Sequence, residues 1–231
     1  MNLLEFDEAY RARYGRIAGL DEAGRGPLAG PVVASAVILE EPIEGVFDSK
    51  SLPPKEREKL FDAIMRRGKV GIGLATPEEI DVLNILNATK LAMERALKAL
   101  GEEVDFLLVD GRHLKLSKPG VCVVKGDMKS LSIAAASIVA KVIRDRVMRA
   151  YSRVYSGYGF EHNFGYPTPD HKTAIKDLGP TTLHRLTFSG VLEIVDDLTL
   201  SRWLEEGRIG FQRYSAVLRR KKKLMKQQGL F

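Results

Sequence analysis

The spacing of hydrophobic residues along this chain predicts a β-sheet in its first half. Five short segments rich in Val, Ile, Leu and Ala, bounded by Gly, Pro or charged residues, are typical of strands. They comprise residues 16–23, 31–41, 68–76, 104–111 and 121–127. Because three adjacent strands are followed by alternating helical and strand segments, we expect an α/β domain with a mixed sheet.

Other segments place apolar residues three or four positions apart, as helices that pack on a core do. Residues 87–101 predict an amphipathic helix, and residues 129–151 predict a long one. The run TPEE at residues 76–79 combines an N-cap threonine, a first-turn proline and two acids, which is typical of a helix start. Residues 200–209 and 211–225 predict two further helices towards the C-terminus.

Composition places the chain among globular proteins. Its 231 residues suit one large domain or a domain with an appendage, and 45% hydrophobic and 29% charged residues allow a sizeable core. The single cysteine, Cys122, lies in an apolar run, so we expect it in the core and exclude an internal disulfide. No secretion signal is present, and the longest nearly apolar stretch, residues 131–140, is too short to span a bilayer. These features predict a cytoplasmic protein that does not enter the membrane.

The excess of positive over negative charge lies at the end of the chain. The whole chain carries +6, and residues 208–231 contain eight Lys or Arg and no Asp or Glu, so residues 1–207 carry −2. The basic character of the whole chain is therefore not evidence that its body is a basic nucleic-acid platform. The basic run at residues 219–223 is expected to strengthen non-specific duplex binding.

Acidic residues stand where three predicted strands end. Asp21 and Glu22 follow the apolar part of the first predicted strand. Asp110 follows the apolar part of the fourth strand, and Asp127 follows the apolar part of the fifth. Strand ends of an α/β sheet feed a shared crevice, so we expect the four carboxylates to converge. Crowded carboxylates need a cation, and an all-oxygen ligand set favours Mg²⁺ or Mn²⁺ over zinc. Taken singly, Asp110 could be a turn residue, Asp127 a helix cap and Glu22 a solvated loop residue.

A glycine-rich loop, Gly24-Arg25-Gly26, follows the acidic pair. The glycines let the backbone approach a ligand closely, and the guanidinium between them suits a phosphate. A tight turn between strands would use the same residues, and the sequence contains no nucleotide-binding glycine fingerprint. The loop and the acids together favour a ligand with phosphates beside a bound metal.

This loop belongs to a longer motif that is specific. The stretch GLDEAGRGPLAGPVVASAVIL resembles the signature of bacterial type-2 ribonuclease H, the ribonuclease HII family. The resemblance continues in family order through DSKSL, NATKLAM, LLVDG, VKGDMKSLSIAAASIVAKVIRDR, GYPTPDH and LHRLTF, over about residues 16–190. It implies a ribonuclease-H-like fold, α/β with a mixed five-stranded sheet flanked by helices. We expect a catalytic domain over residues 1–195 and a small C-terminal helical extension with a basic tail over residues 196–231.

The resemblance also implies an activity. It implies an endonuclease that cleaves the RNA strand of RNA–DNA hybrids and incises 5′ of single ribonucleotides embedded in duplex DNA. Matched by motif, Asp21, Glu22, Asp110 and Asp127 become catalytic carboxylates that bind two divalent cations, Mg²⁺ or Mn²⁺. Hydrolysis assisted by two metal ions would leave a 3′-hydroxyl and a 5′-phosphate. We expect a monomer that acts on such duplexes.

By the same resemblance, other motif residues bind the substrate. The Gly24-Arg25-Gly26 loop would read the ribose 2′-hydroxyl, and Tyr166 would sense the deoxyribose that follows the ribonucleotide. Phosphate contacts are implied for Lys50, Lys129 and Ser130. Backbone groups can bond a 2′-hydroxyl, whereas an aromatic ring that packs on a deoxyribose would crowd that hydroxyl. Without the resemblance, Tyr166 would be interpreted as an amphipathic surface aromatic.

One motif departs from the family pattern. Where the family places His-Lys directly before the Gly-Tyr pair, this chain has Asn163-Phe164, with His162 one position further back. A phosphate-facing lysine is therefore missing, which we expect to affect hybrid affinity more than chemistry. His162, His171 and His184 are interpreted as structural or substrate-path residues, since no spacing pairs them as the acid and base of a metal-free ribonuclease.

Two alternative functions fit parts of the sequence. A non-catalytic hybrid-binding module would need only the loop, the tyrosine and basic residues, but four carboxylates without cations would repel a phosphate backbone. The related type-3 ribonuclease H carries an additional N-terminal substrate-binding domain, whereas about fifteen residues precede the first strand here. Mg²⁺-dependent cutting of a duplex with one ribonucleotide would exclude the binding module.

The last five residues, QQGLF at 227–231, predict a partner. They resemble the Gln-x-x-Leu-Phe peptides that bacterial proteins insert into the replication sliding clamp, with Gln227, Leu230 and Phe231 as anchors. An extended peptide with a Leu-Phe end suits an apolar pocket. The second position lacks the usual leucine, and the alternative is a Leu-Phe end that packs on the protein's own core.

Overall fold

The computed structural model describes residues 2–46, 52–112 and 114–227, which form two compact units. The first unit comprises Met1–Arg25, Val32–Ala75 and Thr89–Arg144. The second comprises Gly26–Pro31, Thr76–Ala88 and Asp145–Phe231. Each unit is thus assembled from three separate segments of the chain. The domain boundary expected at residue 195 stays a prediction.

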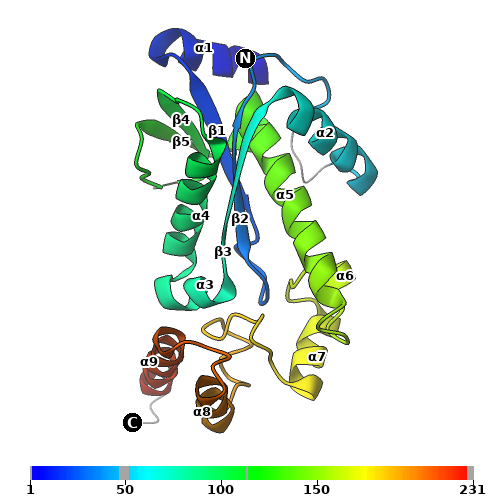
Figure 1. The fold of residues 1–231 in the computed structure, drawn as a ribbon, viewed down its shortest axis with the longest axis vertical. Coiled ribbons are helices and arrows are strands. Elements are labelled where there is room, and N and C mark those ends of the chain that lie inside the picture. Colours follow the sequence, from blue (N-terminus) through cyan, green and yellow to red (C-terminus); the bar gives the residue numbers. More distant parts are fainter. Residues whose placement is uncertain (1, 47–51, 113, 228–231) are drawn as a thin grey trace. The chain divides into compact units, whose positions relative to one another are not determined.

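The first unit contains one mixed sheet (Figure 1). Across the sheet its strands are β3 (Lys69–Ala75), β2 (Val32–Ile38), β1 (Ile17–Ala23), β4 (Phe106–Asp110) and β5 (Gly120–Val123). β1 and β3 both pair antiparallel with β2, whereas β4 pairs parallel with both β1 and β5. The predicted five-stranded mixed sheet is confirmed. Its order makes β1 and β4, which carry three of the predicted acids, direct neighbours.

Helices surround this sheet and form much of the second unit. Those in the described part of the chain are α1 (Leu3–Tyr14), α2 (Pro54–Arg67), α3 (Pro77–Leu83), α4 (Ile85–Leu100), α5 (Leu131–Ser152), α6 (Phe160–Asn163), α7 (Pro169–Leu178), α8 (Asp197–Glu205) and α9 (Phe211–Gln227). A 3₁₀ turn, η1 (Gly126–Met128), precedes α5. None of these helices is long and apolar enough to cross a membrane.

Local capping explains where two predicted helices begin. The Thr76 side chain accepts the N–H of Glu79, and the Glu79 side chain accepts the N–H of Thr76, so α3 starts where the TPEE run predicted. α4 starts two residues earlier than predicted. The cause is Asn84, whose side-chain oxygen accepts the N–H groups of Leu86 and Asn87 at 3.0 and 3.1 Å.

Two glycines let helices approach both faces of the sheet. A Cβ on Gly19 of β1 would overlap the backbone of Ser132 in α5, and a Cβ on Gly71 of β3 would overlap the backbone of Ala96 in α4. The two glycines pair with adjacent residues of β2, so they face opposite sides of the sheet. α5 therefore covers one face and α4 the other, as Figure 1 shows. Because side chains alternate along a strand, Asp21 lies on the α5 face.

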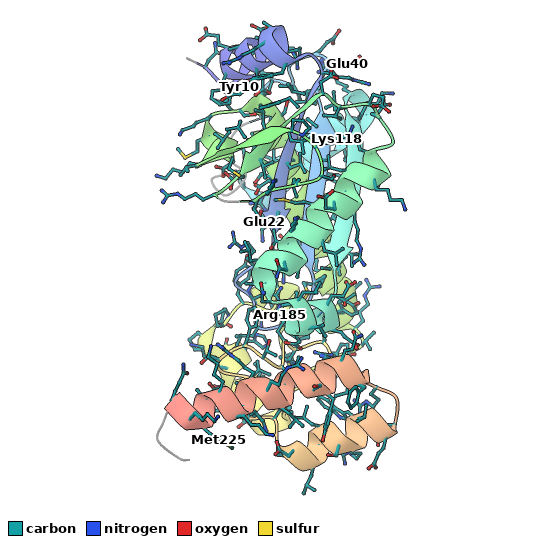
Figure 2. The ribbon with its side chains drawn as sticks, turned by 90° about the vertical axis from the view of Figure 1, so that its left-hand side faces the viewer. Tyr10, Glu22, Glu40, Lys118, Arg185 and Met225 are labelled. Atoms are coloured by element: carbon teal, nitrogen blue, oxygen red, sulfur yellow. The ribbon has the colours of Figure 1, made fainter. Side chains whose placement is uncertain are left out.

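The second unit has an apolar core of its own, with Phe160 and Trp203 among its buried residues. The short segment 26–31 is anchored to this unit by backbone hydrogen bonds. The N–H of Leu28 donates to the carbonyl of Gly165 at 2.8 Å. Arg185, which is fully buried and labelled in Figure 2, donates from Nε to the carbonyl of Gly30 at 3.0 Å. These contacts fix the loop segment that begins at Gly26.

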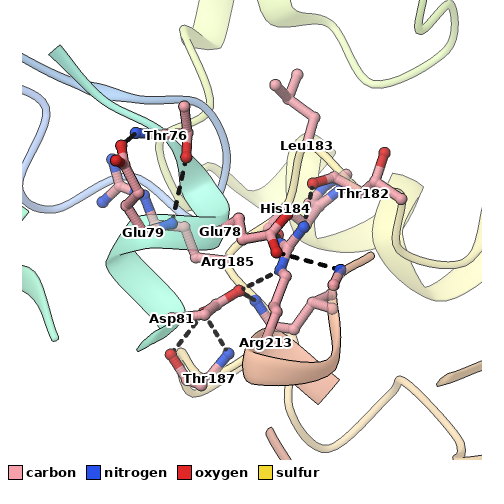
Figure 3. Close-up of polar contacts among 12 residues, drawn as sticks. Thr76, Glu78, Glu79, Asp81, Thr182, Leu183, His184, Arg185, Thr187 and Arg213 are labelled. Atoms are coloured by element: carbon pink, nitrogen blue, oxygen red, sulfur yellow. Dashed lines mark hydrogen bonds and ion pairs between the residues drawn. The ribbon is translucent and has the colours of Figure 1, made fainter. Parts of the chain in front are cut away.

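A buried ion pair joins α3 to α9 inside the second unit (Figure 3). Nε of Arg213 lies 2.9 Å from Oδ2 of Asp81, and both side chains are almost fully buried. The other guanidinium nitrogens donate to the carbonyls of Thr182 and His184 at 2.9 and 2.6 Å. Oδ1 of Asp81 accepts the N–H and the hydroxyl of Thr187 at 2.8 and 2.6 Å. The pair therefore has the hydrogen bonds that two buried charges require.

Candidate functional site

Three of the four predicted carboxylates lie near the ends of neighbouring parallel strands. Asp21 and Glu22 stand at the end of β1, where Figure 2 labels Glu22, and Asp110 is the last residue of β4. Because β1 and β4 run parallel, these ends meet at the same edge of the sheet. Asp127 lies in η1, which follows β5.

Asp21 is buried among like charges. Its side chain is 4% exposed and makes a hydrogen bond with Ser137 of α5. Burial raises the pKa of the Asp21 carboxyl well above its usual value, and the charges of Glu22 and Asp110 raise it further. Oδ1 of Asp21 also accepts the N–H of Glu22 at 2.7 Å. A carboxylate held in this way would gain stability from a bound cation.

Asp110 is tied to the turn that carries Asp127. Its Oδ1 accepts the N–H of Gly126 at 2.6 Å, and the next residue, Asp127, is buried. A Cβ on Gly126 would lie 2.6 Å from Cδ1 of Ile133 and 3.1 Å from Oδ1 of Asp110. Glycine is therefore needed at this position for the turn to reach the end of β4.

Among the described residues, no three or more His, Cys, Asp or Glu side chains are grouped so that they could hold a metal ion. The donor chemistry nonetheless fits a hard divalent cation, because the predicted ligands are all carboxylates. Asp21 is within electrostatic range of Glu22 and Asp110, and Asp127 is connected to them through its neighbour's bond to Asp110. Their assignment as metal ligands stays a prediction.

The glycine loop contributes Gly24 and Arg25 to the first unit and Gly26 to the second. In the first unit, a guanidinium nitrogen of Arg25 lies 3.4 Å from Oε1 of Glu22, which offsets part of the acidic charge. Gly24 has a φ of +99°, a conformation that favours glycine. In the second unit, a Cβ on Gly26 would lie 3.8 Å from Cε1 of Tyr166, so this backbone lies beside the tyrosine ring. Tyr166 is 38% exposed and can therefore meet a ligand.

The remaining predicted substrate contacts differ in accessibility. Lys129 is exposed, as a phosphate contact requires. Ser130 is fully buried, and its hydroxyl accepts the N–H of Ile133 at 3.2 Å and bonds Asp7. Its side chain thus caps the start of α5. Lys50 lies outside the described residues. The substrate roles of these three residues stay predictions.

The residues that replace the family's His-Lys pair shape the turn before the tyrosine. Oδ1 of Asn163 accepts the N–H of Gly165 at 2.7 Å, and its Nδ2 donates to the carbonyl of Tyr158 at 2.6 Å. Phe164 has a φ of +50° and packs against the core of the second unit. The guanidinium of Arg149 lies 5.2 Å from the centre of the Phe164 ring. The departure from the family pattern therefore has a structural role.

Sequence reasoning missed two features of this region. Ser137, which bonds Asp21, is a polar residue inside a nearly apolar helical run, and that contrast was the available signal. His171 and His184 were treated as separate residues, yet their Nε2 atoms lie 3.2 Å apart. No sequence spacing indicates this pairing, because His184 lies in a loop whose path depends on tertiary packing.

One family model and several known proteins are similar to this chain. The model described as Ribonuclease HII matches residues 18–191. Ribonuclease HII of Thermotoga maritima is 53% identical over 212 residues, which cover 92% of this chain and 89% of that protein. The crystal structure of ribonuclease H2 from Pyrococcus horikoshii matches with a TM-score of 0.65 at 32% identity. The matched region covers 77% of this chain and 96% of the Pyrococcus chain. The structure of the PCNA:RNase HII complex from Archaeoglobus fulgidus matches with a TM-score of 0.65 at 26% identity. The matched region covers 74% of this chain and 94% of the Archaeoglobus chain.

Proposed function

Because this chain belongs to the ribonuclease HII family, and is therefore a metal-dependent endonuclease that cuts the RNA strand of RNA–DNA hybrids, we propose that it also incises 5′ of single ribonucleotides in duplex DNA. The family match identifies a type-2 rather than a type-3 enzyme. The observation that carries the metal-dependent chemistry of this proposal is the crowding of Asp21 with Glu22 and Asp110 at adjacent strand ends. The protein would act as a cytoplasmic monomer.

The chemistry would be two-metal-ion hydrolysis. Two divalent cations, Mg²⁺ or Mn²⁺, would activate the attacking water and stabilise the leaving 3′-oxygen. Asp21, Glu22, Asp110 and Asp127 would hold these ions. The hydrogen bond from Ser137 fixes the orientation of the Asp21 carboxylate, and Arg25 offsets charge on Glu22 where a phosphate must approach. A module that only binds hybrids would have no use for a buried, crowded aspartate, because ionising it there costs stability.

Recognition of the RNA–DNA junction would use the glycine loop and the tyrosine. The backbone of residues 24–26 can offer hydrogen bonds to a 2′-hydroxyl without an intervening side chain. The Tyr166 ring lies beside Gly26, so it can pack on the next sugar, where a second 2′-hydroxyl would crowd it. This arrangement supports a preference for a deoxyribose immediately after the ribonucleotide.

Product analysis on a labelled duplex with one ribonucleotide tests the proposed function. We expect one cut on the 5′ side of the ribonucleotide, leaving a 3′-hydroxyl and a 5′-phosphate, with Mg²⁺ or Mn²⁺ required. The all-DNA duplex is the matched control and should stay intact. A 2′,3′-cyclic phosphate product, or cleavage that persists in EDTA, would contradict the two-metal route.

The C-terminal peptide is a separate proposal, in which it binds the replication sliding clamp. An archaeal ribonuclease HII was solved in complex with PCNA, which supports a clamp as partner. Gln227 is the exposed last residue of α9. Leu230 and Phe231 lie outside the described residues, so the proposal depends on their sequence pattern.

Deletion of residues 227–231 should abolish binding to the clamp of the same organism, because it removes the Leu-Phe anchor. Hybrid cleavage and the melting temperature should not change. Surface plasmon resonance with immobilised clamp measures the binding. The matched control is Gln228→Ala, which changes a motif position without an anchor role. Failure of the full-length protein to bind, or a large loss of stability on deletion, would instead indicate a tail that packs on its own core.

A further inference from the structure

Two histidines of the second unit form a buried pair. His171, in α7, and His184 are both fully buried, and their Nε2 atoms lie 3.2 Å apart. The ring centre of Tyr158 lies 5.0 Å from that of His184, and the ring centre of Phe160 lies 5.3 Å from that of His171. Because these surroundings shield the pair from water, each ring nitrogen must find its hydrogen-bond partner within the protein.

The partners at the two ends determine where the ring protons lie. The backbone N–H of Thr181 lies 3.0 Å from Nδ1 of His184 and can only donate, so that nitrogen carries no proton. His184 therefore carries its proton on Nε2 and donates it to Nε2 of His171. At the other end, the carbonyl of Tyr166 lies 2.8 Å from Nδ1 of His171 and can only accept. His171 accordingly donates from Nδ1, and one tautomer of each ring satisfies the whole chain.

Both rings stay neutral at physiological pH, so this order of donors persists. Burial lowers the pKa of His171. Burial, together with the neighbouring His171 and the positive charge of Arg213 on α9, lowers the pKa of His184 to about 3. A proton added to His171 would go on Nε2 and face the Nε2–H of His184, and a proton added to His184 would go on Nδ1 and face the N–H of Thr181. Either addition places two donors face to face, which the buried pair disfavours.

The histidine pair contacts the backbone of Tyr166, the predicted sugar-sensing residue. The carbonyl of Tyr166 accepts from His171 and also from the N–H of Thr168 at 2.8 Å, while its own N–H donates to the carbonyl of Asn163 at 2.8 Å. The ring of the same residue lies beside Gly26. Because the carbonyl and the ring belong to the same residue, a bond that fixes this carbonyl restricts where the ring lies relative to Gly26.

We propose that His171 is a positioning residue for Tyr166, and that His184 sets the tautomer in which His171 can do so. The Nδ1–H of His171 holds the Tyr166 carbonyl, and this bond keeps the aromatic ring beside Gly26. The proposal rests on the proposed role of Tyr166 at the RNA–DNA junction. Both histidines are fully buried, so the proposal gives neither of them a contact with the substrate.

Two isosteres at position 171 separate this role from simple core packing. The amide nitrogen of asparagine can stand at the place of Nδ1 and donate to Tyr166, whereas the amide of glutamine stands at the place of Nε2 and cannot. We expect His171→Gln to slow single-turnover cleavage at one ribonucleotide by about tenfold, as for the loss of one buried hydrogen bond. His171→Asn should stay within about threefold of the unchanged protein. Duplex affinity, measured in EDTA, should change little in both.

The expected order is reversed at position 184. His184 must donate from Nε2, so His184→Gln keeps the required donor and His184→Asn loses it. An effect of side-chain volume would give the same order at both positions, because asparagine is the smaller residue in each case. Thermal unfolding of all four variants separates misfolding from misplacement, and rates are compared only at temperatures where each variant is folded.

Tyr166→Ala is the reference for both proposals. Normal cleavage by Tyr166→Ala would overturn the proposed function of the tyrosine, whatever the histidine variants do. A slow Tyr166→Ala with equal rates for His171→Asn and His171→Gln would overturn the positioning role alone. If His171 acts through Tyr166, the double variant His171→Gln/Tyr166→Ala should be no slower than Tyr166→Ala. Additive losses would show that His171 acts by another route.

Discussion

Asp21→Asn is expected to reduce cleavage of an RNA–DNA hybrid by at least about a thousandfold. Asparagine keeps the size of the side chain and can still bond Ser137, but it removes a negative charge from the group that includes Glu22 and Asp110. That charge is what would hold divalent cations where the scissile phosphate must bind. The measurement is single-turnover cleavage in Mg²⁺ and, separately, in Mn²⁺.

The same substitution should leave the chain folded and, in EDTA, at least as stable as the unchanged protein. Burial and like charges raise the pKa of Asp21 in the folded state, so the charged form is disfavoured by folding. Near neutral pH the ionised carboxylate therefore lowers stability, and a neutral amide removes that cost. Circular dichroism and thermal unfolding in EDTA test this expectation. Added Mg²⁺ should stabilise the unchanged protein more than the variant.

Asp62→Asn is the matched control, since Asp62 is an exposed aspartate on α2. It should cleave normally and bind metal as the unchanged protein does. A folded Asp21→Asn variant with a near-normal rate would disprove the assignment of Asp21 as a metal ligand.

Arg213→Met is expected to destabilise the second unit by about 3–5 kcal/mol, because it leaves the buried carboxylate of Asp81 without its cation. It also removes the donors that reach the carbonyls of Thr182 and His184. A loss of this size lowers the melting temperature by roughly 6–20 °C in a chain of this length. Urea unfolding, followed by the fluorescence of the buried Trp203, measures the loss in this unit.

The double variant Asp81→Leu/Arg213→Met shows where the destabilisation comes from. Replacing both charged residues with apolar ones leaves no lone buried ion. The double variant should therefore lose clearly less stability than Arg213→Met alone. Arg202→Met is the matched control. Arg202 is 64% exposed and lies 4.0 Å from Glu206, so its removal should cost no more than about 1 kcal/mol. Equal losses for Arg202→Met and Arg213→Met would contradict the importance of burial.

The sheet could be predicted from sequence because its strands are apolar runs with clear ends. Helices were harder. α7 begins with Thr168-Pro169-Asp170, the same combination of N-cap, proline and acid that correctly predicted the start of α3. The signal was present at α7 but was not recognised, since the apolar residues that follow are few. α1 was missed as well, although Asn2 and Glu5 form a complete capping box at its start.

The part of the candidate site that could be predicted from sequence is the part that lies at the ends of strands. Asp21, Glu22 and Asp110 lie at such ends, and the family motif names them directly. The bond from Asp110 to the N–H of Gly126 could not be predicted, because it depends on how η1 returns to β4. In sequence, Arg213 belongs to a basic helix that would be interpreted as solvated. Its burial follows only from a partner in another helix.

The ion pair between Asp81 and Arg213 has a consequence for synthesis on the ribosome. Its two residues are 132 positions apart in the sequence. At bacterial elongation rates, Arg213 is therefore added roughly 7–26 seconds after Asp81. The first unit is complete in sequence at Arg144, well before Arg213 is made. During this interval α9 is not available, so α3 cannot bury Asp81 against its partner until Arg213 has been made. Substitutions at this pair should therefore reduce the yield of folded enzyme in cells more than the activity of each molecule that does fold.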